Sequence, residues 1–557
     1  MRDKQMTQQR SEQENRSNEW WRGACLYQIY PRSFLDTNGD GIGDLPGITE
    51  KLDYVAALGV DGIWISPLFT SPMKDFGYDV SNYRDIDPMF GNLENFKTLL
   101  ARAHVLGLKI IIDLVLSHTS NRHPWFNEKP EYYVWADPKP DMFGARVPPN
   151  NWVSVFGGSA WEWHEGRQQY YLHNFLKEQP DLNFHNPDVQ NEALDIAKFW
   201  LDLGVDGFRL DVINFLFHDR ELRDNPPRDE SLGAATQFEG DDPYSAQAHI
   251  YDKSRPENLE FIKKLRALMD QYDSRFTIGE IGDDHPYERS AQYSASGLLN
   301  TCYNTHMMSG QHKPLTTDLI RTPVETALKH GGWPSWAFSN HDVVRAASRW
   351  HAPKDKGGDG FTHNPALSKM LIALLGCLYG TAFLYQGEEL GLPEAKLKFE
   401  DLQDPWGKHL WPEWQGRDGC RTPMPWTETP PSKSWLPTPE THSTLSVAVQ
   451  ENDPASTLNF TRDFINWRKN RPALKTGTIH FHETASDMLI FERRHRTQNE
   501  TQNETQNFLC AFNLTDTENP LPPMLPHCET TAFPQSDKPP AQTLPPYAFW
   551  ISEIKRP

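Results

Sequence analysis

The stretch Val205-Asp-Gly-Phe-Arg-Leu-Asp211 decides the fold, because it is a nearly continuous apolar strand that ends in charged residues. An amphipathic helix precedes it and ends at Gly204; its apolar residues recur at helical spacing, namely Ala193, Ile196, Ala197, Trp200 and Leu201. A strand that is apolar throughout is typical of a parallel sheet that is covered on both faces and joined by right-handed helical crossovers. The stretch therefore predicts an α/β architecture.

The same order of helix, glycine and strand occurs twice more upstream. One helix ends at Gly107 before a strand at residues 109–113, and another ends at Gly59 before a strand at residues 62–66. Further strand candidates lie at residues 25–32, 276–279, 336–339 and 382–385. Because the strand count approaches eight, the pattern favours a TIM (β/α)8 barrel over a doubly wound sheet, and a barrel of about 250 residues leaves room for insertions.

Two regions depart from this order. After the third strand, residues 119–180 are rich in Trp, Pro, Gly and Asn, and we interpret them as a small excursion domain. Residues 475–557 contain short alternating apolar segments, which predict a C-terminal antiparallel β-domain. The barrel then comprises residues 19–118 and 181–474, and the polar residues 1–18 are expected to be disordered.

Composition narrows the class of partner. The chain has 75 acidic and 55 basic residues and a formal charge of −20, which disfavours nucleic acid and anionic membranes. Residues 1–18 contain no apolar signal core, and the longest apolar stretch, residues 370–385, is shorter than the roughly 20 residues of a membrane helix. We therefore expect a cytoplasmic protein that acts on a small neutral molecule.

Charged side chains and imidazoles gather where the predicted strands end: Asp113, His118, Arg209, Asp211, Glu280, His341 and Asp342. In a parallel barrel these ends form the catalytic face. Arg209 and Asp211 are two residues apart, so they share one side of the strand, and the cation would keep the carboxylate ionised. Retaining hydrolysis of a glycoside needs an ionised carboxylate nucleophile and a protonated carboxyl nearby, and Asp211 and Glu280 could supply both. Each acid taken alone could equally be a helix cap or a solvated loop charge.

The sequence resembles the α-amylase family, glycoside hydrolase family thirteen, in four signature regions: Asp113-Leu-Val-Leu-Ser-His118, Gly207-Phe-Arg-Leu-Asp211, Gly279-Glu280 and Phe338-Ser-Asn-His-Asp342. Two further segments, Tyr27-Gln-Ile-Tyr-Pro-Arg32 and Asp418-Gly-Cys-Arg-Thr-Pro-Met-Pro-Trp426, are similar to its α-glucosidase and oligo-1,6-glucosidase branch. The resemblance covers nearly the whole chain.

The resemblance implies a role for each matching residue. Asp211 would be the nucleophile, Glu280 the general acid/base, and Asp342 a third carboxylate that binds sugar hydroxyls. The glucose-binding residues would be His118, His341, Asp75, Tyr78 and Arg421, with Arg209 orienting Asp211. Asp75 and Arg421 would bind the far hydroxyls of a terminal glucose, so the implied action is exo.

Specificity would depend on residues near the leaving sugar. The resemblance places Phe156, Phe175 and Gln179 there, although the two aromatic side chains could instead be the core of the excursion domain. Val212 accompanies α-1,6 preference in this family, whereas the segments around Glu280 and Arg421 look closest to bacterial α-glucosidases that act on short α-1,4-glucosides. The linkage is therefore left open.

Residues 36–44 contain a possible metal loop. Asp36, Asn38 and Asp40 at odd spacing, followed by the Ile42 carbonyl, imitate the first half of a calcium loop. Asp44 could replace the missing bidentate glutamate, and relatives that this sequence resembles bind structural Ca²⁺ or Mg²⁺ here. The alternative is a turn that caps the following helix.

We thus expect a retaining exo-α-glucosidase that hydrolyses short α-glucosides, with some transglucosylation and no organic cofactor. Three rival hypotheses remain: an α-glucosyltransferase, a sucrose-acting enzyme of the same branch, and a non-catalytic barrel that serves as a transporter subunit. The last would lack the carboxylates and carry a membrane helix.

Overall fold

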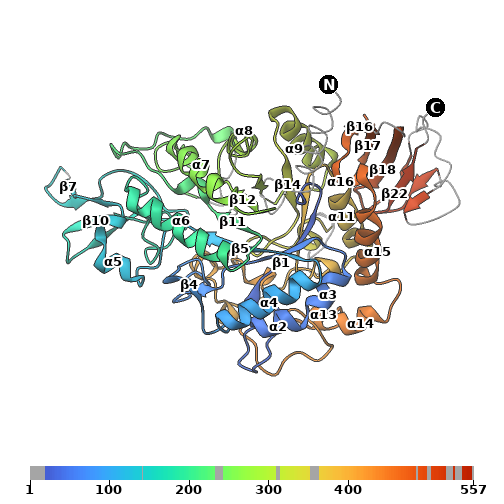
Figure 1. Ribbon diagram of the computed structural model, residues 1–557, viewed down its shortest axis with the longest axis horizontal. Helices are drawn as coiled ribbons and strands as arrows, with labels where there is room; N and C mark the ends of the chain where they lie inside the picture. Colours follow the sequence, from blue (N-terminus) through green and yellow to red (C-terminus); the bar gives the residue numbers. More distant parts are fainter. Residues whose placement is uncertain are drawn as a thin grey trace.

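A computed structural model describes residues 19–554, apart from 141, 233–241, 306, 309–313, 352–362, 485–486, 499–502, 522–530 and 534–541. The prediction for residues 1–18 therefore lies outside the described chain. The centre of the molecule is a closed barrel of parallel strands in the order β1-β15-β14-β13-β12-β11-β5-β2. Figure 1 shows helices around these strands, the excursion domain on one side and the C-terminal sheet on the other. The predicted fold class is confirmed.

The barrel strands are β1 (Cys25–Ile29), β2 (Gly62–Ile65), β5 (Lys109–Val115), β11 (Gly207–Asp211), β12 (Phe276–Glu280), β13 (Thr301–Asn304), β14 (Pro334–Ala337) and β15 (Thr381–Tyr385). The larger helices of the barrel region are α4 (Leu93–Val105), α6 (Pro187–Asp202), α7 (Glu257–Met269), α8 (Pro286–Tyr293), α9 (Thr317–His330), α11 (Pro365–Cys377) and α15 (Thr457–Lys469). One strand, β13, is not predicted from the sequence pattern, because its residues Thr-Cys-Tyr-Asn contain no apolar run.

Helix ends follow from local chemistry. The Asn92 side chain accepts hydrogen bonds from the second and third amides of α4, and the Asn95 side chain accepts one from the Asn92 amide, so the two residues form a capping box. Helix α6 begins with an Asn186 cap and Pro187 at its first position, where the missing N–H costs nothing. Gly107 and Gly204 then reverse the chain at φ +75° and +103°, as their positions after the helices predict.

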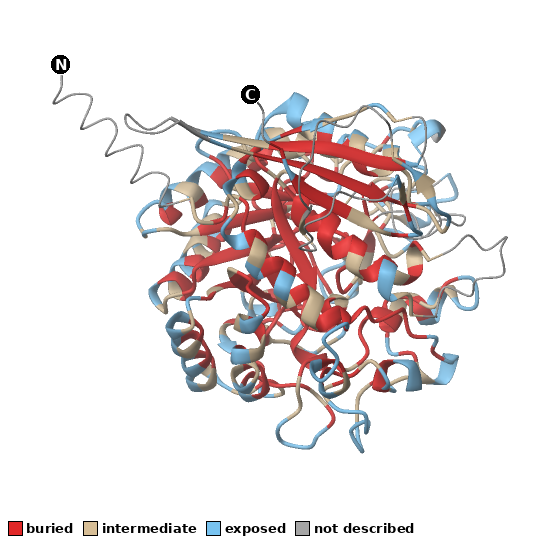
Figure 2. Ribbon diagram, turned by 90° about the vertical axis from the view of Figure 1, so that its right-hand side faces the viewer, coloured by how far each residue is buried: buried red, intermediate tan, exposed pale blue. Residues whose placement is uncertain are grey.

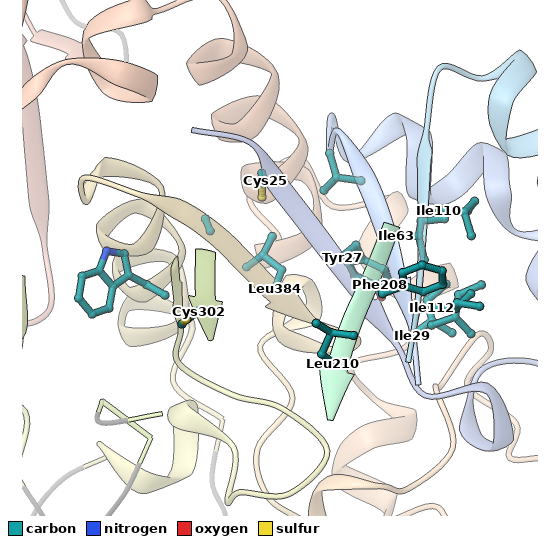
Figure 3. Close-up of a cluster of buried hydrophobic side chains, with 14 of the residues drawn as sticks. Cys25, Tyr27, Ile29, Ile63, Ile110, Ile112, Phe208, Leu210, Cys302 and Leu384 are labelled. Carbon is teal, nitrogen blue, oxygen red and sulfur yellow. The ribbon is translucent and has the colours of Figure 1, made fainter. Parts of the chain in front are cut away.

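Alternate residues of the strands face opposite sides of the barrel wall. Tyr27, Ile63, Ile110 and Phe208 pack in the apolar layer that also contains the helix side chains (Figure 3). Their neighbours of opposite parity form a second cluster, which includes Leu26, Trp64, Ile111, Phe276, Ile278, Tyr303 and Phe383, in the barrel interior. By the same alternation, Arg209 and Asp211 point inward at the carboxyl end of β11.

The two predicted appendages contain antiparallel sheets. In the excursion domain, β6 (Trp135–Ala136), β10 (Gln169–Leu172) and β9 (Trp161–His164) pair in that order. In the C-terminal domain the order is β16 (Thr478–Phe481), β17 (Met488–Gln498), β18 (Asn503–Asn513), β22 (Phe549–Glu553) and β20 (Thr531–Phe533). Buried residues continue from the barrel into this sheet (Figure 2). None of the helices in the described ranges has the length and apolar character needed to cross a membrane.

Arg493 on β17 joins this sheet to the barrel. Its buried guanidinium donates hydrogen bonds to the carbonyls of Cys377 and Leu378, at the end of α11, and to those of Leu474 and Gly477. Burial lowers the pKa of Arg493 to about 10, which still leaves it charged at neutral pH. The cation thus satisfies helix-terminal carbonyls and opposes the negative end of the helix dipole.

Arg493→Met is expected to destabilise the protein by about 3 kcal/mol, because it leaves several buried carbonyls without a donor. The melting temperature at a fixed scan rate should fall by several degrees, while kcat at 25 °C stays close to wild type. Arg496→Met, an exposed position on the same strand, is the matched control. Equal melting temperatures for the two variants would contradict the role given to Arg493.

Candidate active site

Arg209 contacts three carboxylates that lie on three adjacent barrel strands. Its Nη1 is 2.7 Å from Asp113 Oδ1 and 2.5 Å from Asp211 Oδ1, and its Nη2 is 2.6 Å from Glu280 Oε2. The spacing of two residues predicts a contact of Arg209 with Asp211 alone. The structure shows that the same guanidinium also positions the predicted acid/base, and that the buried Asp113 balances the cation from the neighbouring strand.

The environment of these acids sets their protonation. Burial raises the pKa of Glu280 to about 7, although Arg209 opposes the shift. Burial likewise raises the pKa of Asp211, and its short ion pair with Arg209 again favours the charged form. Two carboxyl groups that share one guanidinium and a buried site titrate together, so the pair readily holds one proton. A nucleophile and a general acid need that combination.

Asp342 stays ionised. Burial would raise its pKa, but the cations of Arg421 and Arg417 hold the pKa well below its ordinary value. Arg421 Nη2 lies 2.8 Å from Asp342 Oδ1, and Arg421 Nε donates to the His341 carbonyl at 2.6 Å. This third carboxylate is therefore an acceptor at the pH where Glu280 titrates, which suits the binding of hydroxyl groups.

Two histidines are kept neutral. Burial lowers the pKa of His118 to about 4 and that of His341 to about 3. His341 Nδ1 lies 2.7 Å from Gln28 Nε2, and its Nε2 lies 2.6 Å from the Tyr78 hydroxyl. The Tyr78 ring stacks on His341 with centroids 5.6 Å apart. The structure thus brings together the histidines and the tyrosine that the resemblance assigned to glucose.

Asp75 pairs with Arg417, an arginine that was not among the predicted site residues. Arg417 Nη2 lies 2.9 Å from Asp75 Oδ1, whereas Arg421 contacts Asp342. Arg417 is itself fixed by the buried Asp404, to which it donates from Nε at 3.0 Å and from Nη2 at 2.8 Å. Arg417 Nη1 also lies 3.4 Å from Asp342 Oδ1, so both arginines belong to one cluster with Asp75 and Asp342, and the role of Arg421 at the far hydroxyls stays a prediction. Arg417 was missed because it lies just before the segment that carries the resemblance, Asp418 to Trp426, and Asp404 because its segment has no periodic pattern.

The excursion domain contributes Phe156, Phe175 and Gln179. Gln179 Nε2 lies 3.2 Å from Asp75 Oδ2 and 3.1 Å from His118 Nε2. The Phe175 ring lies 5.2 Å from His118, and the Phe156 ring lies 5.9 Å from Phe175. Both aromatic side chains are half-buried, and the described core of the excursion domain consists of other residues, including Trp152, Trp161 and Leu172. The alternative interpretation of them as core is therefore not supported.

Val212 follows the predicted nucleophile in an unusual backbone conformation. Its φ of 34° and ψ of 48° are left-handed, which a β-branched residue rarely adopts. Its amide donates to Glu280 Oε2 at 3.2 Å. The strained residue therefore bridges the ends of β11 and β12, next to both acids.

The predicted metal loop is a compact turn in which acidic side chains accept backbone amides. Asp36 accepts from Asn38, Gly39 and Gly41, and Asp40 accepts from Ile42. Asp44 caps α2 (Leu45–Glu50) by accepting from Gly47 at 2.7 Å, so the helix-capping alternative holds for this residue. Within the described ranges, no three Asp, Glu, His or Cys side chains gather as metal ligands. The oxygen set of Asp36, Asn38, Asp40 and the Ile42 carbonyl nevertheless suits a hard cation.

The barrel and the buried acid pair at its carboxyl end have what an enzyme that acts on glycosidic bonds requires. A family model described as "Alpha amylase, catalytic domain" matches residues 28–477. A protein of Rhizobium meliloti (strain 1021) described as "Probable alpha-glucosidase" is 52% identical over 515 residues, which cover 89% of this chain and 90% of that protein. An "Oligo-1,6-glucosidase" of Heyndrickxia coagulans is 38% identical, with 82% and 87% covered.

Among solved structures, an "alpha-glucosyl transfer enzyme, XgtA" superimposes with a TM-score of 0.88 at 48% identity, covering 96% of this chain and 99% of that one. This chain belongs to the α-amylase family and to its α-glucosidase branch. It is a glycoside hydrolase, so the hypothesis of a non-catalytic barrel is set aside.

Proposed function

We propose that this chain is a retaining exo-α-glucosidase that removes terminal non-reducing glucose from short α-glucosides. The arrangement of Asp211 and Glu280 on one guanidinium carries the proposal. Two carboxylates that contact the same guanidinium favour the short separation of retaining enzymes over the wider gap that an inverting enzyme needs for water. Asp211 attacks the anomeric carbon while Glu280 protonates the leaving oxygen, and Glu280 then deprotonates the water that releases glucose.

The exo part of the proposal is supported by the Asp75 end of the site. Asp75 and Arg417 form an ion pair there, and Arg417 forms a second ion pair with the buried Asp404. Such a buried, charged end suits the hydroxyl groups of a chain terminus. A continuing polysaccharide would have to displace the ion pair.

The proposal is tested by initial rates on maltose, isomaltose, sucrose and soluble starch, with the first product anomer followed by proton NMR. Glucose should appear first as the α-anomer, and starch should be degraded only slowly from its ends. A first product in the β-configuration would reject retention, and rapid internal cleavage of starch would reject exo action. The ratio of maltose to isomaltose rates decides the linkage that Val212 leaves open, and fructose release from sucrose would favour the sucrose-acting rival.

Glucosyl transfer is a second candidate, because the transfer enzyme described above shares 48% identity with this chain. The same carboxylates serve both reactions, since a sugar or alcohol can replace water in the second step. Products formed from maltose at high acceptor concentration distinguish them. Transfer products that exceed free glucose at low conversion would make transfer the main activity.

We also propose that Asp36, Asn38, Asp40 and the Ile42 carbonyl bind a structural Ca²⁺ or Mg²⁺. A bound cation would neutralise the two acidic side chains and stabilise the loop between β1 and α2. Millimolar Ca²⁺ or Mg²⁺ is expected to raise the melting temperature of protein treated with chelator, and Asp40→Asn should remove most of that gain. Asp53→Asn, an exposed acid on α3 (Leu52–Ala57), is the control. An unchanged melting temperature with both ions would reject the site.

A further inference from the structure

The rings of Trp406 and Phe156 are in contact beside the Asp75 end of the site, although the two residues are far apart in the sequence. Trp406 lies on α12 (Pro405–Leu410), in the segment after β15, and Phe156 belongs to the excursion domain. Their ring centroids are 5.1 Å apart, and the rings are inclined by 44°. The buried Trp414 packs edge-on against Trp406, with ring centroids 4.5 Å apart, and this contact fixes the Trp406 indole.

The same two rings are tied to the charged residues beside Asp75. Asp404 caps α12 by accepting the Trp406 amide at 3.3 Å, and it holds Arg417 through a 2.8 Å ion pair. The Arg417 guanidinium carbon lies 5.5 Å from the Phe156 ring centroid, so we take Phe156 to border the Asp75 end, whereas the resemblance implies the leaving-sugar side. The position of the indole therefore depends on the ion pairs that define the Asp75 end.

We propose that Trp406, in contact with Phe156, forms the outer part of a wall that closes the site beyond the terminal glucose. Trp406 is thereby a specificity-determining residue for exo action. The inference rests on the proposed function, since it assumes that Asp75 and Arg417 face the non-reducing end. Two packed rings from separate segments exclude added atoms by volume rather than by charge, so the wall discriminates by size.

A pair of substrates that differs only at the wall tests this inference: 4-nitrophenyl α-D-glucoside and its 4-O-methyl derivative. The wild type should hydrolyse the parent far faster. Trp406→Ala should raise the ratio of kcat/KM for the methylated substrate to that for the parent by about tenfold or more, because the removed indole leaves room for the methyl group. Trp406→Phe keeps an aromatic ring and should keep most of the discrimination.

Phe399→Ala is the matched control, since this half-exposed ring lies in the same segment and contacts Trp411 rather than the wall. Phe156→Ala removes the opposite ring and should also raise the ratio. A folded Trp406→Ala with an unchanged ratio, or with equal losses on both substrates, overturns the inference. If Trp406→Ala fails to fold, the same criteria apply to Trp406→Leu. A wild type that cleaves starch internally would instead overturn the exo function.

Discussion

Asp211→Asn is expected to lower kcat/KM for 4-nitrophenyl α-D-glucoside by about 10⁴-fold or more, because the amide cannot form the glycosyl-enzyme. The amide also loses the ion pair with Arg209, which lies 2.5 Å from the carboxylate. The folded structure should survive, since the two side chains have nearly the same shape. Stopped assays at long times, with substrate well below KM, measure the residual rate.

The control is Asp202→Asn, an exposed carboxylate near the end of α6 that pairs with Lys198. It should leave kcat/KM unchanged. A further readout separates a nucleophile from a merely structural acid. Asp211→Gly supplied with azide should form β-glucosyl azide, because azide attacks the anomeric carbon from the vacated side and displaces 4-nitrophenolate with a single inversion. An Asp211→Asn variant with more than a few per cent of wild-type activity would refute the assignment of the nucleophile.

The barrel was largely predictable because its strands obey short-range rules. Apolar strands after glycine-terminated helices located β2, β5 and β11, and a charged strand end marked the catalytic face. β13 was not predicted because its burial comes from α8, which packs over it, rather than from an apolar run of its own. Its Ser335 and Trp333 contacts lie in the next strand and loop, so tertiary packing, not local pattern, makes it a strand.

Contacts within the site were predictable where two residues lie on the same face of one strand. They were less predictable where residues from distant loops come together. Arg209 beside Asp211 followed from a spacing of two. Arg209 also contacts Glu280 because the order of strands in the barrel places β12 next to β11. Arg417 and Trp406 belong to a long segment without periodicity, and their partners Asp75 and Phe156 are hundreds of residues away. Such contacts depend on the assembled barrel and carry no local signal.

Glu280→Gln is expected to lower kcat/KM for maltose by about 10³-fold, because the amide cannot protonate the departing glucose. The loss should be much smaller for α-D-glucosyl fluoride, since fluoride leaves without full protonation. This dependence on the leaving group distinguishes an acid from a residue that only shapes the site.

The pH dependence of kcat/KM follows from the raised pKa of Glu280. A general acid works in its protonated form, so a pKa raised to about 7 by burial keeps Glu280 active up to neutral pH. Wild-type kcat/KM should then fall tenfold per pH unit above about pH 7. Glu280→Gln should lose this alkaline limb, while the acid limb, which requires ionised Asp211, remains.

Replacing Glu288, an exposed acid on α8, by Gln should preserve both limbs. An alkaline limb that persists in Glu280→Gln would mean that another group donates the proton. Because Arg209 contacts both acids, an Arg209→Lys variant should move both limbs together, which neither acid acting alone would produce.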